Sequence, residues 1–187
     1  MNNIVILENF VDLEDLKKIQ DFLPTINEWD NLCSHESFDL RNKSDILYWK
    51  DRQCSGDIIL KLDKEIYDIV NKYILKMKLY LEDRFKVELS SNNNPTIVKW
   101  NIGQEMSPHA DGYDLSGKKY GGQNYAISCI LYLNDDFDGG ELYYTNQDIE
   151  IKPVAGMCVA HPSTLCYTHG VKKITSNNRW TSPFYFS

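Results

Sequence analysis

Residues 107–112 place a histidine and an aspartate, His109 and Asp111, two positions apart. Side chains alternate between the two faces of an extended backbone, so these two would project the same way while Ala110 points opposite. An imidazole and a carboxylate in this arrangement are two of the three protein ligands of a non-haem iron site, and a further histidine completes the set. The pattern is short and also occurs in surface loops, so the rest of the chain must supply the other features of such a site.

Two later histidines compete for the third position. His169 falls near the end of a predicted strand, 60 residues after His109, while His161 precedes a proline and a turn. Both are reasonable strand-end residues, so spacing alone leaves the choice open. The remaining histidine, His35, lies in a polar region and is expected to be exposed.

Three residues in the second half of the chain could bind a ligand. Arg179 and Thr181 would share one face of a predicted strand. A guanidinium beside a hydroxyl suits bidentate binding of a carboxylate, and an arginine aimed inward needs an anion because an unpaired buried charge is costly. A surface arginine at the end of a turn fits the position equally well. Tyr132, preceded by small residues on its strand face, could offer its hydroxyl to a ligand or pack as an ordinary core residue.

The first half of the chain is predicted to be mainly helical. Ile4–Leu7 reads as a short strand, and Asp12 as the N-cap of a helix that Pro24 ends. Apolar residues then recur at helical spacing over residues 55–84. This stripe predicts one long helix packed on the protein's own sheet.

Beyond Pro95 the sequence changes to short β-prone runs broken by turn residues, which is typical of a sandwich or barrel. The run at 125–133 is apolar on both faces and should form a central strand. The Gly-rich segment 110–124 is predicted to be a surface loop beside the site, either a lid or a plain connection. The candidate strands are 96–101, 125–133, 141–145, 149–151, 157–161, 166–171 and 180–186.

Composition favours an ordered globular monomer. The chain has 187 residues, 42% of them hydrophobic, and a formal charge of −7. An acidic surface argues against a nucleic-acid partner. No apolar run approaches the ~20 residues of a membrane span, and the first residues lack the pattern of a signal peptide. The five scattered cysteines form no Cys-x-x-Cys pair and are expected to be reduced, as in a cytoplasmic protein.

Taken together, these positions resemble the iron(II)/2-oxoglutarate-dependent dioxygenases, specifically their prolyl 4-hydroxylase-like branch. Any one motif is weak, but their order and spacing together are specific, and the resemblance is strongest after Trp100. It rests on segments 109–111, 130–134, 139–142 and 169–171, and on Arg179, ten positions after His169.

The resemblance implies an α+β, β-rich fold with a double-stranded β-helix (jelly-roll) core and N-terminal helices packed on one sheet. Residues 1–187 would then form a single oxygenase domain. Within it, residues 1–95 would give mainly helical support, and residues 96–187 would form the jelly-roll core.

The resemblance also assigns site residues. Arg179 would hold the distal carboxylate of the cosubstrate 2-oxoglutarate, assisted by Thr181 and Tyr132, and no catalytic side chain beyond the metal ligands is implied. The implied metal ligands are His109, Asp111 and His169.

Two positions depart from the family pattern. His161 stands where an aromatic residue is common, and the match of His169-Gly170-Val171 favours His169 over it as the ligand. Trp100 stands where many relatives have a tyrosine, which leaves the cosubstrate contacts on that side undefined.

The activity implied is that of an Fe(II)- and 2-oxoglutarate-dependent dioxygenase that uses O2, with ascorbate as reductant. It would hydroxylate an unactivated C–H, foremost in a prolyl residue of a peptide or protein, with a small molecule as the other substrate class, and release succinate and CO2. Two alternatives stand beside it. A zinc-dependent hydrolase could use the same ligands, but it has no need of Arg179 and no glutamate is an evident general base. A non-catalytic jelly-roll binding protein would not need the complete ligand set.

Overall fold

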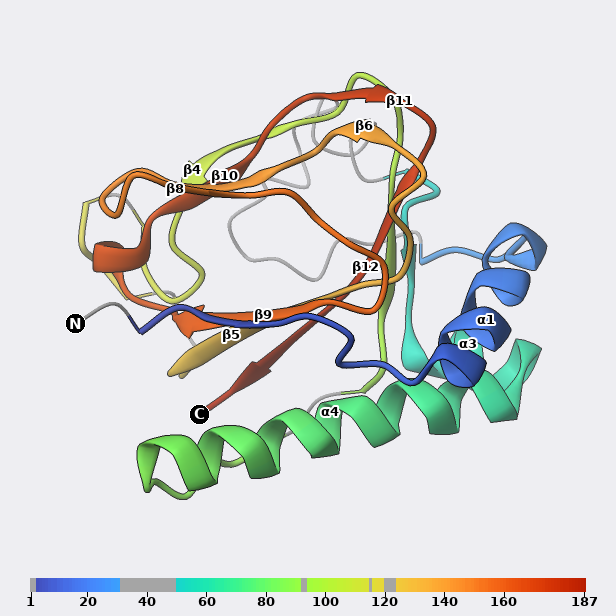
Figure 1. The fold of residues 1–187 in the computed structure, drawn as a ribbon, viewed down its shortest axis with the longest axis horizontal. Coiled ribbons are helices and arrows are strands. Elements are labelled where there is room, and N and C mark those ends of the chain that lie inside the picture. The colour runs from blue at the N-terminus through green and yellow to red at the C-terminus, as the bar shows by residue number, and fades with distance from the viewer. Residues whose placement is uncertain (1–2, 31–49, 92–93, 115, 120–123) are drawn as a thin grey trace.

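The computed structural model describes residues 3–30, 50–91, 94–114, 116–119 and 124–187. Their strands form two antiparallel sheets that face each other (Figure 1). The larger sheet contains, in spatial order, β1 (Val5–Leu7), β9 (Cys158–Pro162), β5 (Ile127–Tyr132), β12 (Arg179–Phe186), β3 (Ile97–Trp100) and β2 (Gln53–Cys54). The smaller sheet contains β4 (Met106–His109), β10 (His169–Val171), β7 (Leu142–Tyr144) and β8 (Ile149–Ile151). A further pair joins β6 (Asp138–Gly139) and β11 (Ile174–Ser176).

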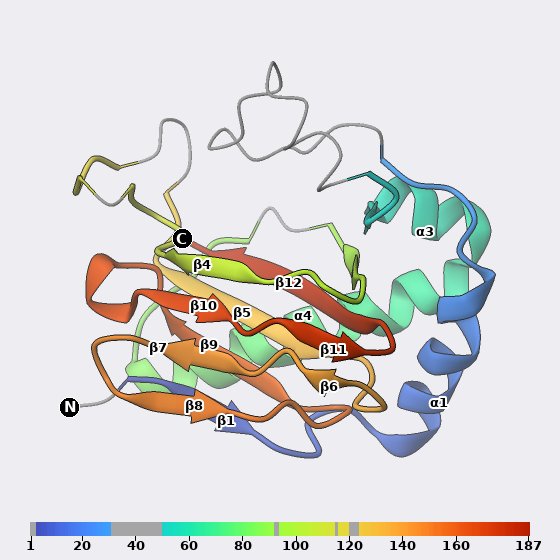
Figure 2. The ribbon, with the colours of Figure 1, turned by 90° about the horizontal axis from the view of Figure 1, so that it is seen from above.

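Helices cover the outer face of the larger sheet. The longest, α4 (Lys64–Phe85), lies across this face, and α1 (Leu13–Phe22) and α3 (Gly56–Leu62) lie at one end of it (Figures 1 and 2). The predicted jelly-roll core with N-terminal helices on one sheet is therefore confirmed.

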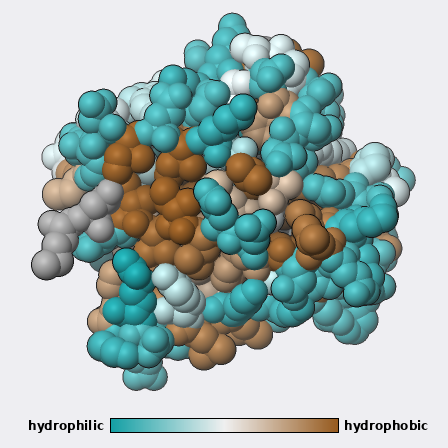
Figure 3. Space-filling view, viewed as in Figure 1, coloured by the Kyte–Doolittle hydropathy of each residue, from teal (hydrophilic) through white to brown (hydrophobic). Residues whose placement is uncertain are grey.

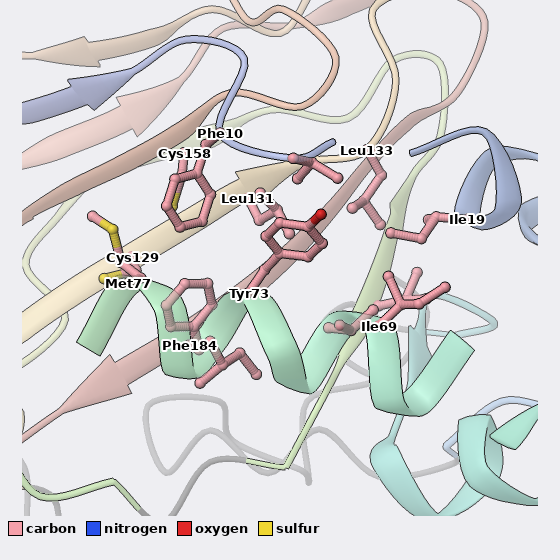
Figure 4. Close-up of a cluster of buried hydrophobic side chains, with 14 of the residues drawn as sticks. Phe10, Ile19, Ile69, Tyr73, Met77, Cys129, Leu131, Leu133, Cys158 and Phe184 are labelled. Carbon is pink, nitrogen blue, oxygen red and sulfur yellow. The ribbon is translucent and has the colours of Figure 1, made fainter. Parts of the chain in front are cut away.

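The main core lies between α4 and the larger sheet. Tyr73 and Met77 of α4 are fully buried there, against Leu131 of β5 and Phe184 of β12 (Figure 4). Burial of an apolar side chain of this size stabilises the fold by about 1.5–3 kcal/mol. This apolar layer therefore packs the outer face of the sheet against the helices. The inner face of the sheet faces the smaller sheet instead.

The long helix predicted over residues 55–84 is in fact two helices. Asp63 separates α3 from α4 with an extended backbone (φ −157°, ψ 106°). Its carboxylate accepts hydrogen bonds from the backbone N–H groups of Glu65 and Ile66, as an N-cap does. The prediction of one helix was wrong because the apolar stripe continues across this residue and hides the cap.

At the start of the chain, α1 begins after Asp12, as predicted, but the Asp12 side chain makes no capping bond. Its backbone N–H instead donates to the Tyr73 hydroxyl, and its carboxylate accepts from Lys72. The helix ends in a short 3-10 turn at Leu23–Thr25 that contains Pro24. These contacts tie α1 to α4 at the edge of the core.

The predicted strands all appear, with each end at most three residues from its predicted position. The run at 125–133 contains β5, which lies between β9 and β12 and is central, as predicted. The short strands β2, β4, β6 and β11 were not predicted. They contain few apolar residues, so they carry almost no period-two signal.

The surface polarity, the helices and the cysteines of the described residues complete the description of the fold. Polar side chains cover most of the face in Figure 3, and an apolar area lies over β1, β8 and β9. Among the helices of the described segments, none has both the length and the apolar composition needed to cross a bilayer. Cys54, Cys129 and Cys158 are buried and free.

Candidate metal centre

Strand pairing brings His109 and His169 together. β4 runs antiparallel to β10, and in their register His169 lies directly opposite His109. Asp111 follows two residues after the end of β4, so the backbone returns its side chain to the same side. Three residues that the sequence places up to 60 positions apart thereby meet at one point between the two sheets.

The ligating atoms of these three residues all lie within 4.8 Å of one another. The Nε2 atom of His109 is 3.5 Å from Asp111 Oδ1, and the Nε2 atom of His169 is 3.7 Å from Asp111 Oδ2. Two imidazoles and one carboxylate grouped in this way are the donor set of a facial metal triad, which leaves coordination positions open.

Both ligand histidines are held in the tautomer that a metal requires. His109 Nδ1 lies 3.0 Å from the Ser107 carbonyl oxygen, and His169 Nδ1 lies 3.0 Å from the Tyr167 carbonyl oxygen. A carbonyl oxygen only accepts hydrogen bonds, so Nδ1 carries the proton in each ring. The Nε2 lone pairs are therefore free for a metal ion, and the donor set fits Fe(II).

The charges within the cluster favour the ligating forms. Burial alone would raise the pKa of Asp111, but its interactions with the His169 and His109 rings, including a hydrogen bond with His109, outweigh it and hold that pKa below its usual range. Burial, with the neighbouring His161, lowers the pKa of His169 to about 3. Asp111 is therefore a carboxylate and His169 a neutral imidazole at physiological pH.

Access to the cluster is one-sided. The side chain of His109 is 29% exposed, whereas those of Asp111 and His169 are 8% and 4% exposed. A ligand must therefore approach from the His109 side, while the other two residues close the back of the site.

Glycines beside the ligands allow close backbone contacts. A Cβ at Gly170 would lie 2.5 Å from the Tyr143 hydroxyl and 2.7 Å from the Met106 carbonyl oxygen. A Cβ at Gly112 would lie 2.8 Å from the Ser163 carbonyl oxygen. No larger residue fits either position without a shift of neighbouring atoms, which explains a glycine directly after each of the ligands His169 and Asp111.

Further inside, the structure brings together the three residues predicted to hold an anion. Arg179, Thr181 and Tyr132 are all buried, and Thr181 lies opposite Tyr132 in the register of β12 with β5. The guanidinium carbon of Arg179 lies 5.1 Å from the ring centroids of both Tyr132 and Trp100. Arg179 is only 1% exposed, which excludes the alternative of a surface arginine.

The Gly139-Gly140 pair lies directly beside the Arg179 side chain. Both glycines have positive φ, and a Cβ at Gly140 would lie 2.9 Å from Cδ of Arg179 and 3.0 Å from the Phe137 ring. The arginine stem therefore packs directly on the backbone of this turn. The motif predicted from sequence has a steric role in placing the guanidinium.

His161, the rejected ligand candidate, is buried beside the cluster. Its ring centroid is 4.4 Å from that of His169 and 5.3 Å from that of Tyr144. Its Nδ1 lies 3.3 Å from the Pro162 carbonyl oxygen, while its Nε2 and the Tyr144 hydroxyl are buried without a hydrogen-bond partner among the described residues. His161 is not one of the three residues whose ligating atoms converge.

Sequence reasoning missed Arg52 and Tyr144. Arg52 is fully buried, its Nε donates to the Lys99 carbonyl oxygen at 2.9 Å, and its guanidinium carbon lies 4.4 Å from the centroid of the Trp100 ring. It precedes the two-residue strand β2, where no pattern signals burial. Tyr144 is the third residue of β7 and points inward, a position that period-two alternation from Leu142 could have indicated. His35 and part of the 110–124 loop lie outside the described residues.

Comparison with protein families gives a match over the half of the chain that carries this site. The model described as "2OG-Fe(II) oxygenase superfamily" matches residues 95–187. Prolyl 3-hydroxylase 1 of Rattus norvegicus is 40% identical over 65 residues, which are 32% of this chain and 9% of that protein. Prolyl 3-hydroxylase 2 of Mus musculus is 38% identical over the same length. The chain thus spans less than a tenth of the curated relatives it matches.

Solved structures show the same fold over nearly the whole chain. The viral collagen prolyl hydroxylase of Paramecium Bursaria Chlorella virus-1, solved with 2OG, has a TM-score of 0.70 and 12% identity, over 99% of this chain and 95% of that one. A prolyl hydroxylase of Trichoplax adhaerens, solved with a hypoxia-inducible-factor peptide fragment, has a TM-score of 0.66 and 14% identity, over 100% and 84%. At these identities the likeness shows a shared fold.

Proposed function

Residues 95–187 belong to the 2OG-Fe(II) oxygenase superfamily, and we propose that the chain hydroxylates an unactivated C–H of a peptidyl proline. The reaction would consume 2-oxoglutarate and O2 and release succinate and CO2. One observation carries the proposal: a His-Asp-His cluster and a buried arginine with two hydroxyl-bearing neighbours line the same interior. The family implies Fe(II), 2-oxoglutarate and O2 as the reacting partners of such a site.

His109, Asp111 and His169 would hold the iron. Bound Fe(II), with 2-oxoglutarate and dioxygen, supplies the oxidising power that replaces a C–H bond with C–OH. The chain contributes binding and orientation: Asp111 brings one negative charge, and the two histidines bring neutral nitrogen donors. The burial of Asp111 and His169 keeps water away from the back of the site.

Arg179 would bind the distal carboxylate of 2-oxoglutarate. The guanidinium is buried at the inner end of the site, and its planar fork of N–H donors suits bidentate binding of a carboxylate. Thr181 and Tyr132 stand beside it and could each donate one hydrogen bond to the same group. Anchored there, the cosubstrate would present its 2-oxo acid end toward the metal ligands.

Several finer points belong to the same proposal. Prolyl residues are the suggested target because prolyl 3-hydroxylases and prolyl hydroxylases recur among the similar proteins, and a small-molecule substrate is the other class. Residues 1–187 would act as one domain, since β1 and β2 join the same sheet as the C-terminal strands. We also propose a monomer that uses ascorbate as reductant in a reducing compartment such as the cytoplasm.

The two alternative functions, a zinc hydrolase and a non-catalytic binding protein, explain fewer features of the site. A zinc hydrolase would use the three ligands but leaves the buried Arg179 without a role. A non-catalytic jelly roll would need neither the ligand tautomers nor the one-sided access. Metal analysis of protein purified without oxygen separates zinc from iron directly.

The direct test supplies the purified chain with Fe(II), ascorbate and 2-oxoglutarate. We expect 2-oxoglutarate binding and succinate formation, and a product one oxygen heavier among proline-containing peptides by mass spectrometry. Arg179→Ala should raise the 2-oxoglutarate requirement, whereas Arg84→Ala, at an exposed position of α4, should not. Absence of both 2-oxoglutarate binding and succinate in the wild type would exclude the proposed activity.

A further inference from the structure

We propose that Trp100 is a positioning residue that occupies one lone pair of the Thr181 oxygen, leaves the Thr181 proton for a bound anion, and thereby makes this site prefer a carboxylate to a neutral, amide-like end. This inference rests on the proposed function, because it concerns the selectivity for 2-oxoglutarate. It assigns a role to the residue at which the chain departs from the tyrosine of many relatives.

The hydrogen bond between Trp100 and Thr181 has only one possible direction. Trp100 Nε1 lies 3.3 Å from Thr181 Oγ1, and both side chains are buried. An indole N–H donates and cannot accept, so the threonine oxygen is the acceptor. The proton of the Thr181 hydroxyl must then point away from Trp100, and it has no acceptor among the described residues.

The strand register places the Thr181 hydroxyl beside Arg179 and Tyr132, where its proton can reach a bound anion. Trp100 lies opposite Arg179 in the pairing of β3 with β12, and its indole reaches diagonally to Thr181, two residues further along the same face. Thr181 lies opposite Tyr132 in the pairing of β12 with β5. The face that Thr181 shares with Arg179 and Tyr132 is the interior of the barrel, where the hydroxyl proton can reach a bound anion.

Two arginines fix the indole in place. The guanidinium carbons of Arg52 and Arg179 lie 4.4 Å and 5.1 Å from the Trp100 ring centroid, and these residues come from the segments on either side of β3. Each guanidinium is attracted to the face of the indole ring, and burial of the pair strengthens the attraction. The indole is therefore held in the orientation that its hydrogen bond to Thr181 requires.

Among the described residues, this site offers mainly hydrogen-bond donors. A guanidinium has no acceptor, and Trp100 occupies one of the two lone pairs of the Thr181 oxygen. An ionised carboxylate, which only accepts, can receive hydrogen bonds from Arg179, Thr181 and Tyr132. The NH2 of a primary amide finds no acceptor on the guanidinium and only the remaining lone pairs of the hydroxyls.

The test compares 2-oxoglutarate with the analogue whose distal carboxylate is a primary amide. Binding of each compound to the Fe(II)-loaded protein is measured by calorimetry without oxygen, so no turnover is involved. Trp100→Phe keeps an aromatic ring but removes the N–H. We expect it to weaken 2-oxoglutarate binding about tenfold and amide binding much less, so that the preference for the carboxylate falls about tenfold.

Two further variants test whether Trp100 acts through Thr181. Thr181→Val should lower the preference at least as much as Trp100→Phe, and adding Trp100→Phe to Thr181→Val should lower it no further, because Trp100 acts only through the Thr181 hydroxyl. Thr181→Ser, which keeps the hydroxyl, should retain the preference. Trp180→Phe removes an indole from the opposite face of the same strand and serves as the matched control.

An unchanged carboxylate preference in Trp100→Phe, or losses that add in the double variant, would overturn the inference while leaving the proposed function intact. A wild-type chain that binds neither compound would overturn the proposed function, and this inference with it. The two failures are therefore distinguishable in one set of titrations.

Discussion

The two faces of the larger sheet are built from the same strands but have opposite characters. Outward residues of β5, β9 and β12 join the apolar core beneath α4, as Leu131, Cys158 and Phe184 do. The inward faces of the same strands carry the polar residues Tyr132, His161, Arg179 and Thr181, all buried, beside apolar residues such as Val159. The period of two along each strand thus keeps the candidate site residues on the inner face.

The difference between the two faces shows which part of the molecule offsets the free-energy cost of burying the polar residues of the site. Burying an arginine, a histidine and tyrosine hydroxyls is unfavourable unless their polar groups find partners. The outer face carries little of this cost: most of its side chains are apolar and buried, with Ser182 as a buried polar exception. A site with this many buried polar groups is tolerated because the opposite face of the same strands supplies the stabilisation. Variants on the two faces should therefore fail in different ways.

The largest effect is expected from Asp111→Ala on the inner side. It removes the only charged ligand of the cluster, so metal affinity should fall by more than about 100-fold, because residues merely behind the ligands are worth 10–100-fold. Metal titration and succinate formation measure the loss. Asp21→Ala, exposed on α1, is the control; an Asp111 variant that still binds Fe(II) tightly would remove this residue from the ligand set.

Leu131→Ala should show the opposite behaviour. Leu131 is fully buried under α4, and truncation of such a leucine costs about 2–5 kcal/mol. Denaturant unfolding should show that loss, while the affinity of the folded protein for 2-oxoglutarate stays unchanged. A change in that affinity comparable to the loss of stability would mean that the two faces are not independent.

Tyr132→Phe is the inner-face partner of that variant, one residue along the same strand. The Tyr132 hydroxyl is buried without a hydrogen-bond partner among the described residues, so its removal should cost no stability. Affinity for 2-oxoglutarate should fall by about 5–10-fold, the worth of one hydrogen bond to a charged group. Parallel unfolding and binding titrations test both halves, and a marked loss of stability would show that the hydroxyl has a structural partner.

The smallest effect concerns the junction of α1 and α4, far from either face. Asp15 accepts hydrogen bonds from Lys72 and the Tyr73 hydroxyl, each at 2.7 Å, and these partners lower its pKa. Because the folded-state pKa lies below the unfolded value of about 3.9, the stabilisation is present above that pH and is lost as the pH falls through the folded-state pKa. Asp15→Asn should cost about 0.5–1 kcal/mol at pH 7 and less near pH 2. Unfolding at the two pH values measures the difference, and an equal cost at both would exclude the ionic contribution.

The sequence carried enough information for the metal residues but not for the choice between two histidines. Alternation in a strand placed His109 and Asp111 on one side, and the structure agrees. His161 and His169 could not be separated by pattern because both occupy inward strand positions and their rings lie in contact. The family resemblance favoured His169, and only the convergence of ligating atoms distinguishes the two physically.

Other features escaped for physical reasons that can be named. Asp63 divides a helix whose apolar stripe continues unbroken, so periodicity cannot detect the cap. β4, which carries His109, contains Ser107 and Pro108 and has little apolar character. Arg52 is buried by contacts with residues far along the chain, above all Trp100, and long-range contacts leave no local pattern.

The bonds that hold the two ligand histidines have a further consequence for how the protein acquires its iron. In each case the ring is held by the carbonyl oxygen of the residue two positions earlier, so folding alone sets both donors in place. A metallo-domain without such supports folds only around its ion. Here the ion would add stability by mass action, about 2.7 kcal/mol at a free concentration 100 times its dissociation constant. We therefore expect the metal-free chain to be folded and to bind Fe(II) without refolding when the ion becomes available.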